Sequence, residues 1–403
     1  MQTGYIDHFS PVVAGLSGRT VMQIIPSLGF GGAERIVLAL AAALANVGAR
    51  SLVACEDGGM VSELQAKGGI WLPFPAKAKN PISMALNVQR LTQLMRLEGV
   101  DLIHAHSRAP AWAALGASRR TQKPFVTTFH SSYESGGRAK SVYNSVMTRS
   151  DAIVTHSEYT AGLISQNFPA VQDKVRVISA GIDFHEYSPA MVSAERVSRV
   201  RADWGVAAHE HIVLLPARLA GTKDHRTLLE AAKILTARGL SQTKFVLAGE
   251  APARSAQVRE IDALIVKYQL QECVRQVSPC VDLPASFLSA ALVVVPSTEA
   301  ESFGLTSVEA QALGTPVIVS NAGAVAETIL VKPSAKGIRR TGWHVPPNNP
   351  QELAEVILKA LSLGASAKDA LSCGAREHVT HRFALEQMMS ETMDLYAALI
   401  RCC

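Results

Sequence analysis

The feature that most constrains this chain is a regular alternation of short β-rich runs with longer helical patterns along most of its 403 residues. Such alternation predicts parallel strands, because each helical crossover returns the chain to the same end of the sheet. Helices then cover both faces of the sheet. We therefore expect an α/β fold of the doubly wound type, with ligands bound beyond the carboxyl ends of the strands.

The strand-like runs fall into two series on either side of a polar, charged stretch at residues 179–210. The first series is Val21–Pro26, Ser51–Cys55, Ile70–Pro73, Leu102–Ala105, Phe125–Phe129, Ala152–Thr155 and Val175–Ile178. The second is Ile212–Pro216, Lys244–Ala248, Val274–Val277, Leu292–Pro296 and Pro316–Ser320. Helical patterns lie between them, as at Ala33–Asn46, Leu86–Leu97 and His225–Ala237.

Two series predict two doubly wound domains that face each other across a ligand cleft. The expected divisions are an N-terminal tail, a first domain, a linker, a second domain and a C-terminal helix that packs back on the first domain. Their bounds are residues 1–19, 20–180, 181–210, 211–383 and 384–403.

Composition narrows the class of protein. With 48% hydrophobic and 18% charged residues, the chain is able to fill two cores, and with 5% aromatic residues it lacks a stacking surface for single-stranded nucleic acid. Six cysteines without a C-x-x-C pair indicate reduced thiols. The N-terminus does not resemble a secretory signal, and the apolar runs are too short to span a bilayer. We therefore expect a cytoplasmic protein.

Positive charge is concentrated in the first half, since residues 1–180 contain 17 Lys and Arg against 11 Asp and Glu. An anionic acceptor or an anionic membrane surface would complement this charge. The basic segment at residues 138–147 predicts an amphipathic helix suited to docking on the inner face of the cell membrane, although an ordinary solvated helix fits the same pattern.

A glycine-rich loop, Ser27-Leu28-Gly29-Phe30-Gly31-Gly32-Ala33-Glu34, joins the first strand to the first helix. Free N–H groups at a helix start favour an anion such as a phosphate. The loop lacks the third glycine of a dinucleotide fingerprint, but Glu56 follows the second strand as a ribose-binding acid would, so a nicotinamide enzyme stays an alternative. A turn that only tightens the strand-to-helix junction is another.

Two stretches of the second half carry more chemistry. Arg218 and Lys223 follow its first strand, where both cations are placed to meet one diphosphate and neutralise it as a leaving group. Glu301 and Glu309 follow the apolar run that ends at Pro296, and the intervening Ser-Phe-Gly predicts the start of a helix. Carboxylates at this spacing are placed to accept hydrogen bonds from the hydroxyl groups of one sugar or ribose.

These stretches resemble glycosyltransferase family 4, whose members are retaining enzymes with the GT-B fold of two Rossmann-like domains. The resemblance covers about residues 20–360. It rests on Glu301-x7-Glu309 with Ser-Phe-Gly, the following Ala-Gln-Ala-Leu-Gly-Thr-Pro-Val, Arg218-Leu219 with Lys223, and the Gly-Gly-Ala-Glu of the first loop. Other matching stretches are His104-Ala-His106-Ser, Thr-Phe-His130, Ser157-Glu158 and Gly181-Ile-Asp183.

The resemblance implies a role for each residue. Arg218 and Lys223 would bind the donor diphosphate, Glu309 the ribose, and Glu301 the transferred sugar. His130 would lie in the cleft as a further catalytic residue. The remaining donor-binding positions are Gly31, Gly32, Gly249, Glu250, Ser302, Phe303, Gly304 and Leu305.

Three departures from the family pattern bear on the site. Asp224 stands where a glycine is common, Thr306 and Ser307 replace apolar residues, and the segment at 277–280 lacks a glycine expected near the base. The identity of the nucleotide base therefore stays open.

The predicted function is transfer of a hexose, with retention, from a nucleotide sugar to a cell-surface glycan or lipid-linked acceptor of the lipopolysaccharide or exopolysaccharide type. The nucleotide sugar is a substrate, and we expect no cofactor and no nucleic-acid partner. No D-x-D motif is present, so the cations of the protein would replace a metal ion; zinc held by His104, His106 and His130 is the weaker alternative. A sugar-nucleotide epimerase and a catalytically silent sugar-nucleotide-binding subunit are the other functions considered.

Overall fold

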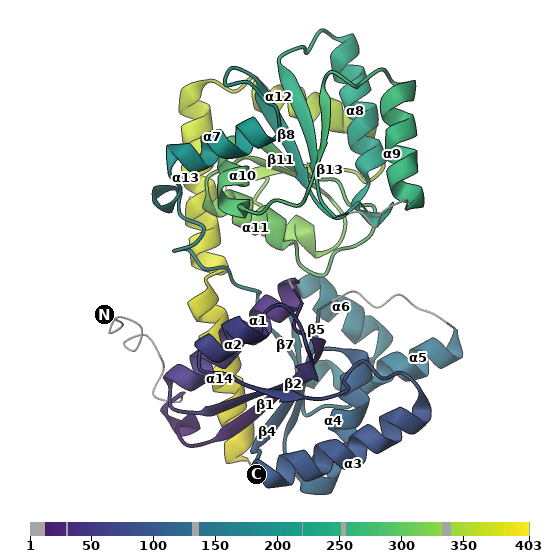
Figure 1. Ribbon diagram of the computed structural model, residues 1–403, viewed down its shortest axis with the longest axis vertical. Helices are drawn as coiled ribbons and strands as arrows, with labels where there is room; N and C mark the ends of the chain where they lie inside the picture. Colours follow the sequence, from purple (N-terminus) through teal and green to yellow (C-terminus); the bar gives the residue numbers. More distant parts are fainter. Residues whose placement is uncertain are drawn as a thin grey trace. The chain divides into compact units, whose positions relative to one another are not determined.

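The computed structural model describes residues 13–29, 31–130, 137–219, 221–250, 255–332 and 340–402. The chain divides into two compact units, Met1–Gly181 together with Leu385–Cys403, and Ile182–Ala384. Each unit is a parallel sheet with helices packed around it (Figure 1). The predicted α/β fold of two Rossmann-like domains is therefore confirmed.

The sheet of the first unit has seven parallel strands in the order β3-β2-β1-β4-β5-β6-β7. The strand order changes direction on either side of β1, so ligand-binding loops are expected beyond β1 and β4. The strands are β1 (Thr20–Ser27), β2 (Arg50–Glu56), β3 (Ile70–Pro73), β4 (Leu102–Ala105), β5 (Phe125–Phe129), β6 (Ala152–Thr155) and β7 (Val175–Val177).

The helices of this unit follow the strands in turn, and the C-terminal helix α14 (Leu385–Arg401) packs beside α1 and the short 3-10 helix η1. Tyr396 of α14 is completely buried. The others are η1 (Val13–Leu16), α1 (Gly32–Asn46), α2 (Val61–Ala66), α3 (Pro81–Leu97), α4 (Arg108–Thr121), α5 (Arg138–Asn144), η2 (Ser145–Thr148), α6 (Glu158–Asn167) and η3 (Pro169–Lys174).

The amphipathic α-helix predicted at residues 138–147 is shorter in the structure. The α-helix α5 ends at Asn144, and the 3-10 helix η2 carries the chain through Thr148. Asn144 is buried, and its side-chain oxygen accepts a hydrogen bond of 2.9 Å from Arg108. A tertiary contact therefore holds the end of this helix, which a pattern of apolar and basic residues does not reveal.

The sheet of the second unit has six parallel strands in the order β10-β9-β8-β11-β12-β13. They are β8 (His211–Pro216), β9 (Thr243–Ala248), β10 (Val274–Val277), β11 (Leu292–Val295), β12 (Val317–Ser320) and β13 (Gly342–Val345). The sequence did not predict β13, whose Gly-Trp-His-Val run lacks the apolar character of the other strands. It pairs with β12 at the edge of the sheet.

Residues 181–210 were predicted as a linker, and all of them except Gly181 group with this second unit. Within them, Arg196 of α7 (Ala194–Asp203) forms an ion pair of 2.7 Å with Asp282. The other helices are η4 (Pro189–Met191), η5 (Gly221–Lys223), α8 (His225–Ala237), α9 (Ala256–Lys267), α10 (Leu283–Ser289), α11 (Leu305–Ala312), η6 (Ala324–Thr328), α12 (Pro350–Leu361) and α13 (Ala365–Arg382).

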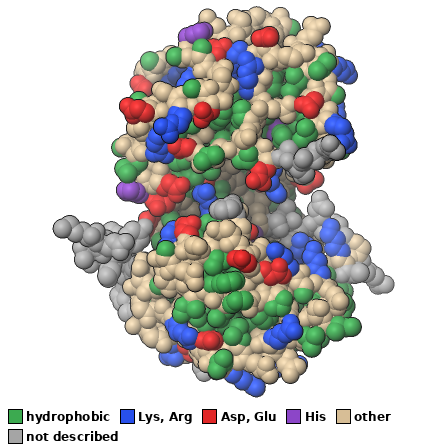
Figure 2. Space-filling view, viewed as in Figure 1, with side chains coloured by type: hydrophobic (Ala, Val, Ile, Leu, Met, Phe, Trp, Pro, Cys, Tyr) green, Lys and Arg blue, Asp and Glu red, His purple; other side chains and the backbone are tan. Residues whose placement is uncertain are grey.

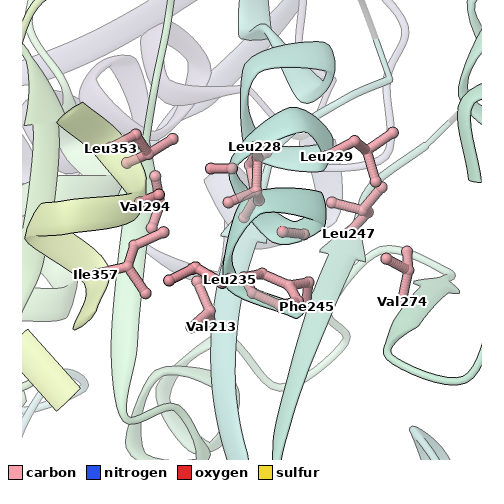
Figure 3. Close-up of a cluster of buried hydrophobic side chains, with 14 of the residues drawn as sticks. Val213, Leu228, Leu229, Leu235, Phe245, Leu247, Val274, Val294, Leu353 and Ile357 are labelled. Atoms are coloured by element: carbon pink, nitrogen blue, oxygen red, sulfur yellow. The ribbon is translucent and has the colours of Figure 1, made fainter. Parts of the chain in front are cut away.

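A continuous hydrophobic core joins α8 and α12 to one face of the second sheet (Figure 3). Leu228 and Leu235 of α8 and Ile357 of α12 are completely buried. They pack over strand residues such as Val213 and Phe245. Because the strands are apolar and tightly covered, their carboxyl ends present fixed loops for a ligand.

Candidate active site

The loops after β8 and β9 hold each other in place at the carboxyl edge of the second sheet. The N–H of Leu219 donates a hydrogen bond of 2.9 Å to the backbone oxygen of Glu250. A Cβ atom on Gly249 would lie 1.9 Å from the oxygen of Ala217, so only glycine fits there. Gly249 and Glu250 therefore shape the loop that carries Arg218, and the side chains of Glu250 and Arg218 are exposed.

Lys223 and Glu301 form an ion pair at this edge. Lys223 ends the short helix η5 after β8, and Glu301 lies in the loop after β11. The Lys223 Nζ atom is 2.6 Å from the Glu301 Oε1 atom, and the two side chains are 28% and 19% exposed. The hydroxyl of Ser297 donates to the same carboxylate oxygen. The pair is thus fixed in place but open to solvent and to a ligand.

A small pocket of about 120 Å³ lies beside this ion pair, between the ends of β8 and β11. It is lined by Leu215, Pro216, Ala217, Lys223, Val294, Val295, Pro296, Ser297 and Thr306. The lining thus presents one cation, Lys223, and two hydroxyl groups, and Glu301 contacts two of these residues, Lys223 and Ser297.

The helix α11 begins at this site with a glycine whose backbone conformation other residues rarely adopt. Gly304 caps the helix with φ at 109°, and a Cβ atom there would lie 2.8 Å from Val325 Cγ2. The neighbouring Phe303 is buried against Phe383, with ring centroids 5.4 Å apart. The loop Ser302–Gly304 therefore holds one conformation, and the first N–H groups of α11, from Leu305 on, form a site for an anion.

Glu309 lies in the second turn of α11 and is 8% exposed. Its Oε1 atom accepts a hydrogen bond of 3.0 Å from the hydroxyl of Tyr187, which is itself buried. Sequence reasoning missed Tyr187, because it is separated from Glu309 by 122 residues and has no motif around it. This hydrogen bond holds one carboxylate oxygen of Glu309 in place.

Two of the departures from the family pattern, Asp224 and Ser307, have local explanations. Asp224 has φ at 50°, the left-handed region that glycine adopts readily and aspartate tolerates. Its carboxylate accepts from the Thr227 N–H and so caps α8. Ser307 is buried in a polar network, where it accepts hydrogen bonds from Gln311 and Thr328.

In the first unit, the predicted glycine loop leads into α1. Gly31 is the N-cap and Gly32 the first residue of this helix, while Phe30 lies outside the described residues. A Cβ atom on Gly58 would come 2.1 Å from the oxygen of Leu28, so the next loop packs closely on this one. The start of α1 thus provides free N–H groups at the edge of the sheet.

His130 directly follows β5 and lies between two other histidines. Its Nε2 atom is 2.9 Å from His106 Nδ1, and its Nδ1 atom is 3.3 Å from His156 Nε2. Burial and the neighbouring rings hold the pKa of His130 well below its usual range. The sequence drew attention to His106 and His130 but not to His156, although all three follow strands in the same way.

The ring of His104 lies 4.0 Å from that of His106, between centroids, but its two ring nitrogens contact hydroxyl groups and not histidines. Its Nδ1 atom contacts the hydroxyl of Tyr396 at 2.5 Å, and its Nε2 atom contacts that of Thr128 at 2.7 Å. The histidines therefore lie side by side and do not converge on a common point. Within the described part of the chain, no group of three or more His, Cys, Asp or Glu is arranged to hold a metal ion.

Two family models match the chain, "Glycosyltransferase Family 4" over residues 30–186 and "Glycosyl transferases group 1" over residues 198–378. The chain belongs to glycosyltransferase family 4. Among curated members, the D-inositol 3-phosphate glycosyltransferase of Saccharomonospora viridis is 29% identical over 305 residues, which cover 74% of this chain and 64% of that protein. The protein of the same name from Jonesia denitrificans is 26% identical over 312 residues, covering 73% and 71% of the two chains.

Solved structures of glycosyltransferases share the fold of this family 4 chain. A glycosyltransferase from Rickettsia africae superposes with a TM-score of 0.86 and 27% identity, over 96% of this chain and 99% of that one. Anabaena HepE, solved with UDP and glucose, gives a TM-score of 0.81 at 22% identity over 94% and 100% of the two chains. The predicted GT-B architecture is thus confirmed.

The structure brings together part of the predicted site. Lys223 and Glu301 are in direct contact, and Ser302 to Leu305 form the start of α11. The side chain of Arg218 has no ion pair within the described ranges, so its role at a diphosphate stays a prediction. The roles of Glu309 and His130 toward a ligand also stay predictions.

Proposed function

We propose that this chain is a retaining glycosyltransferase that moves a hexose from a nucleotide sugar to an acceptor hydroxyl group. The main support is the Lys223–Glu301 ion pair, which opens onto a pocket at the start of α11. A cation and free helix N–H groups suit a diphosphate, and a carboxylate suits a sugar hydroxyl. These groups lie within the second family model.

The proposed reaction needs few groups from the protein. The bond between the anomeric carbon of the hexose and the diphosphate oxygen breaks, and the diphosphate leaves with the electron pair. The acceptor oxygen forms its bond on the same face, and its proton passes to the leaving diphosphate. Lys223, Arg218 and the N–H groups of α11 stabilise the negative charge that develops on the leaving group. In this proposal Glu301 holds the hexose and Glu309 the ribose.

We propose that the reaction needs no metal ion, since the positive charge at the diphosphate comes from the protein. Chelation of divalent ions with EDTA is then expected to leave the rate unchanged. Loss of activity in EDTA, restored by Mg²⁺ or Mn²⁺, contradicts this part of the proposal.

The identities of the donor and the acceptor are to be determined by testing candidate compounds directly. HepE was solved with UDP and glucose, and this favours UDP-hexoses as the first donors to test. The predicted acceptor is a cell-surface glycan or a lipid-linked saccharide of the lipopolysaccharide or exopolysaccharide type. The names of the two bacterial relatives favour an inositol phosphate as a further acceptor to test.

The decisive experiment incubates the protein with UDP-, GDP- and ADP-hexoses, with and without each acceptor. Nuclear magnetic resonance of the product reports whether the anomeric configuration is retained. An acceptor-dependent glycoside with retained configuration supports the proposal. Release of an altered nucleotide sugar without an acceptor identifies an epimerase, and tight donor binding without any product identifies a silent binding subunit.

We also propose that the first unit docks on the anionic inner face of the cell membrane. No described helix meets the length and hydropathy of a transmembrane span. The helix α3 has no acidic residue and exposes Ile82, Leu86 and Leu97 beside Arg90 and Arg96. Hydrophobic side chains also gather on the visible surface of this unit, with Lys and Arg nearby (Figure 2).

Docking is tested by co-sedimentation with neutral and anionic vesicles at low and high salt. Each Lys or Arg near an anionic surface contributes about 1 kcal/mol, so binding is expected only with anionic vesicles and only at low salt. Leu86→Ser is expected to weaken it. Val266→Ser, a matched change at a position of α9 that is 63% exposed, is expected to leave it unchanged. Equal recovery with both vesicles contradicts docking and leaves the transferase proposal intact.

A further inference from the structure

The stretch Gly181-Ile182-Asp183 leads into a short turn that carries Tyr187. The Oδ1 atom of Asp183 accepts hydrogen bonds from the N–H groups of His185, at 2.8 Å, and Glu186, at 3.4 Å. Its backbone oxygen accepts a third, of 2.9 Å, from the N–H of Tyr187. An aspartate that bonds to the backbone two and three residues ahead stabilises a turn. Asp183 therefore fixes the course of the chain up to Tyr187.

Both ends of this segment are anchored within the second unit. At its start, the N–H of Ile182 donates a hydrogen bond of 3.0 Å to the backbone oxygen of Phe383. At its end, Tyr187 is only 2% exposed, whereas His185 and Glu186 are exposed. The turn thus leaves its tip in solvent and buries the ring of Tyr187.

The hydroxyl of Tyr187 meets Glu309 of the proposed donor site. It donates a hydrogen bond of 3.0 Å to the Glu309 Oε1 atom, in the second turn of α11. Because the Tyr187 ring is buried, its hydroxyl restricts the orientation of the carboxylate. A donated hydrogen bond also favours the ionised form of a carboxylate, which only accepts hydrogen bonds. Both effects prepare Glu309 to accept from hydroxyl groups of a ligand.

We propose that Tyr187 and Asp183 are positioning residues for Glu309. The turn held by Asp183 places the Tyr187 hydroxyl, and this hydroxyl orients the Glu309 carboxylate for the 2′ and 3′ hydroxyl groups of a ribose. A carboxylate has about four acceptor positions, so one hydrogen bond from Tyr187 does not exclude others to a ligand. The inference rests on the proposed function, in which Glu309 binds the ribose.

Tyr187→Phe tests the proposal, because it removes the hydroxyl and keeps the ring. We expect its affinity for a nucleoside diphosphate to fall about fivefold, the equivalent of one ordinary hydrogen bond. Its affinity for the 2′,3′-dideoxy form is expected to stay unchanged, because that ligand has no ribose hydroxyl groups. With the sugar donor, KM is expected to rise about fivefold at constant kcat, since the ribose contact is the same in the ground state and the transition state.

The affinities of the full chain are measured by isothermal titration calorimetry with UDP, GDP and ADP and with the 2′,3′-dideoxy form of each. Urea unfolding checks that each variant folds. Tyr268→Phe is the matched control, because the Tyr268 hydroxyl donates a hydrogen bond of 3.3 Å to Glu230 Oε1 in the same unit. Tyr268 follows the last residue of α9, at the edge of the sheet opposite the pocket. This variant is expected to change neither the affinities nor KM.

Two variants of Asp183 test the turn and serve if Tyr187→Phe fails to fold. Asp183→Ala removes the side-chain acceptor, so it is expected to weaken binding of the ribose-bearing nucleotide and not of the dideoxy form. Asp183→Asn keeps an acceptor oxygen at the same place and is expected to restore most of the affinity. In a Glu309→Ala background, Tyr187→Phe is expected to cause no further loss, because it acts through Glu309.

The outcomes separate this inference from the proposed function. A native protein that binds none of the nucleotides, or binds the dideoxy forms as tightly as the others, contradicts the ribose site and this inference with it. If Glu309→Ala abolishes the preference for the ribose-bearing ligand and Tyr187→Phe leaves it unchanged, only the positioning role is wrong. Equal losses for both ligands in Tyr187→Phe, or a further loss in the Glu309→Ala background, show a purely structural role and also overturn the inference.

Discussion

The replacement Lys223→Met tests the proposed donor site most directly, because it removes one charge and keeps an apolar stem of similar length. A charge-assisted hydrogen bond to a phosphate contributes about 1.5–3 kcal/mol, which corresponds to a loss of roughly 10- to 150-fold in affinity for a nucleoside diphosphate. The effect on folding is expected to be smaller. The Lys223–Glu301 pair is partly exposed, and such pairs contribute at most about 1 kcal/mol to stability.

A second ion pair of the same unit provides the control. Lys244 Nζ lies 3.0 Å from Glu210 Oε1, and the two side chains are 13% and 15% exposed. Lys244→Met removes a lysine of equal charge from a similar pair away from the pocket. We expect it to lower the unfolding free energy at least as much as Lys223→Met and to leave nucleotide affinity unchanged.

The affinity of each variant for UDP, GDP and ADP is measured by isothermal titration calorimetry, and its stability by urea unfolding. The double variant Lys223→Met with Glu301→Gln separates two causes of weaker binding. If Lys223 acts on the phosphate, nucleotide affinity stays low in the double variant. If the loss arises because Glu301 is left with an unpaired charge, affinity recovers. A folded Lys223→Met protein that binds nucleotides as tightly as the native protein would refute the assignment.

Three further outcomes are expected. Glu309→Gln weakens binding of the free nucleoside diphosphate as well as of the sugar donor, measured by calorimetry; loss for the sugar donor alone would place Glu309 at the hexose. Gly304→Ala destabilises the protein by more than the roughly 1–2 kcal/mol of left-handed strain, because its Cβ meets Val325, whereas Gly239→Ala, with φ at 86° and open space, shows the strain alone in urea unfolding. Burial lowers the pKa of His225 from 6.5 to about 4 in the folded protein. Between these two pH values the unfolded chain binds more protons than the folded one, so the unfolding free energy falls by roughly 3 kcal/mol as the pH drops from 6.5 to 4. Equal stability of the native protein at pH 7.5 and pH 4 contradicts this.

The sequence predicted most strands because their apolar runs are short, regular and bounded by polar loops. β3, β4, β5, β6 and β10 have the predicted bounds. The edge strand β13 was missed because its Gly-Trp-His-Val run is not a continuous apolar run, and its His344 is half-buried. The end of α5 was misplaced because the buried Asn144, held by Arg108, is a tertiary contact that periodicity does not encode.

The site was predictable where neighbouring residues carry the chemistry, and not where distant segments meet. Glu301 and Glu309 stand in one short motif, and the loop between them was recognised as a helix start. The hydrogen bond from Tyr187 to Glu309 joins two segments that share no local pattern. Only the packing of residues 182–188 within the second unit brings that hydroxyl to the carboxylate.

The row of histidines shows a further kind of information that a sequence holds only implicitly. Each ring could be placed at a strand end from the sequence, but their order across the sheet depends on which strands are neighbours. Because β4, β5 and β6 are adjacent and flanked by β1 and β7, the three rings fall between the acceptors Gln23 and Ile178.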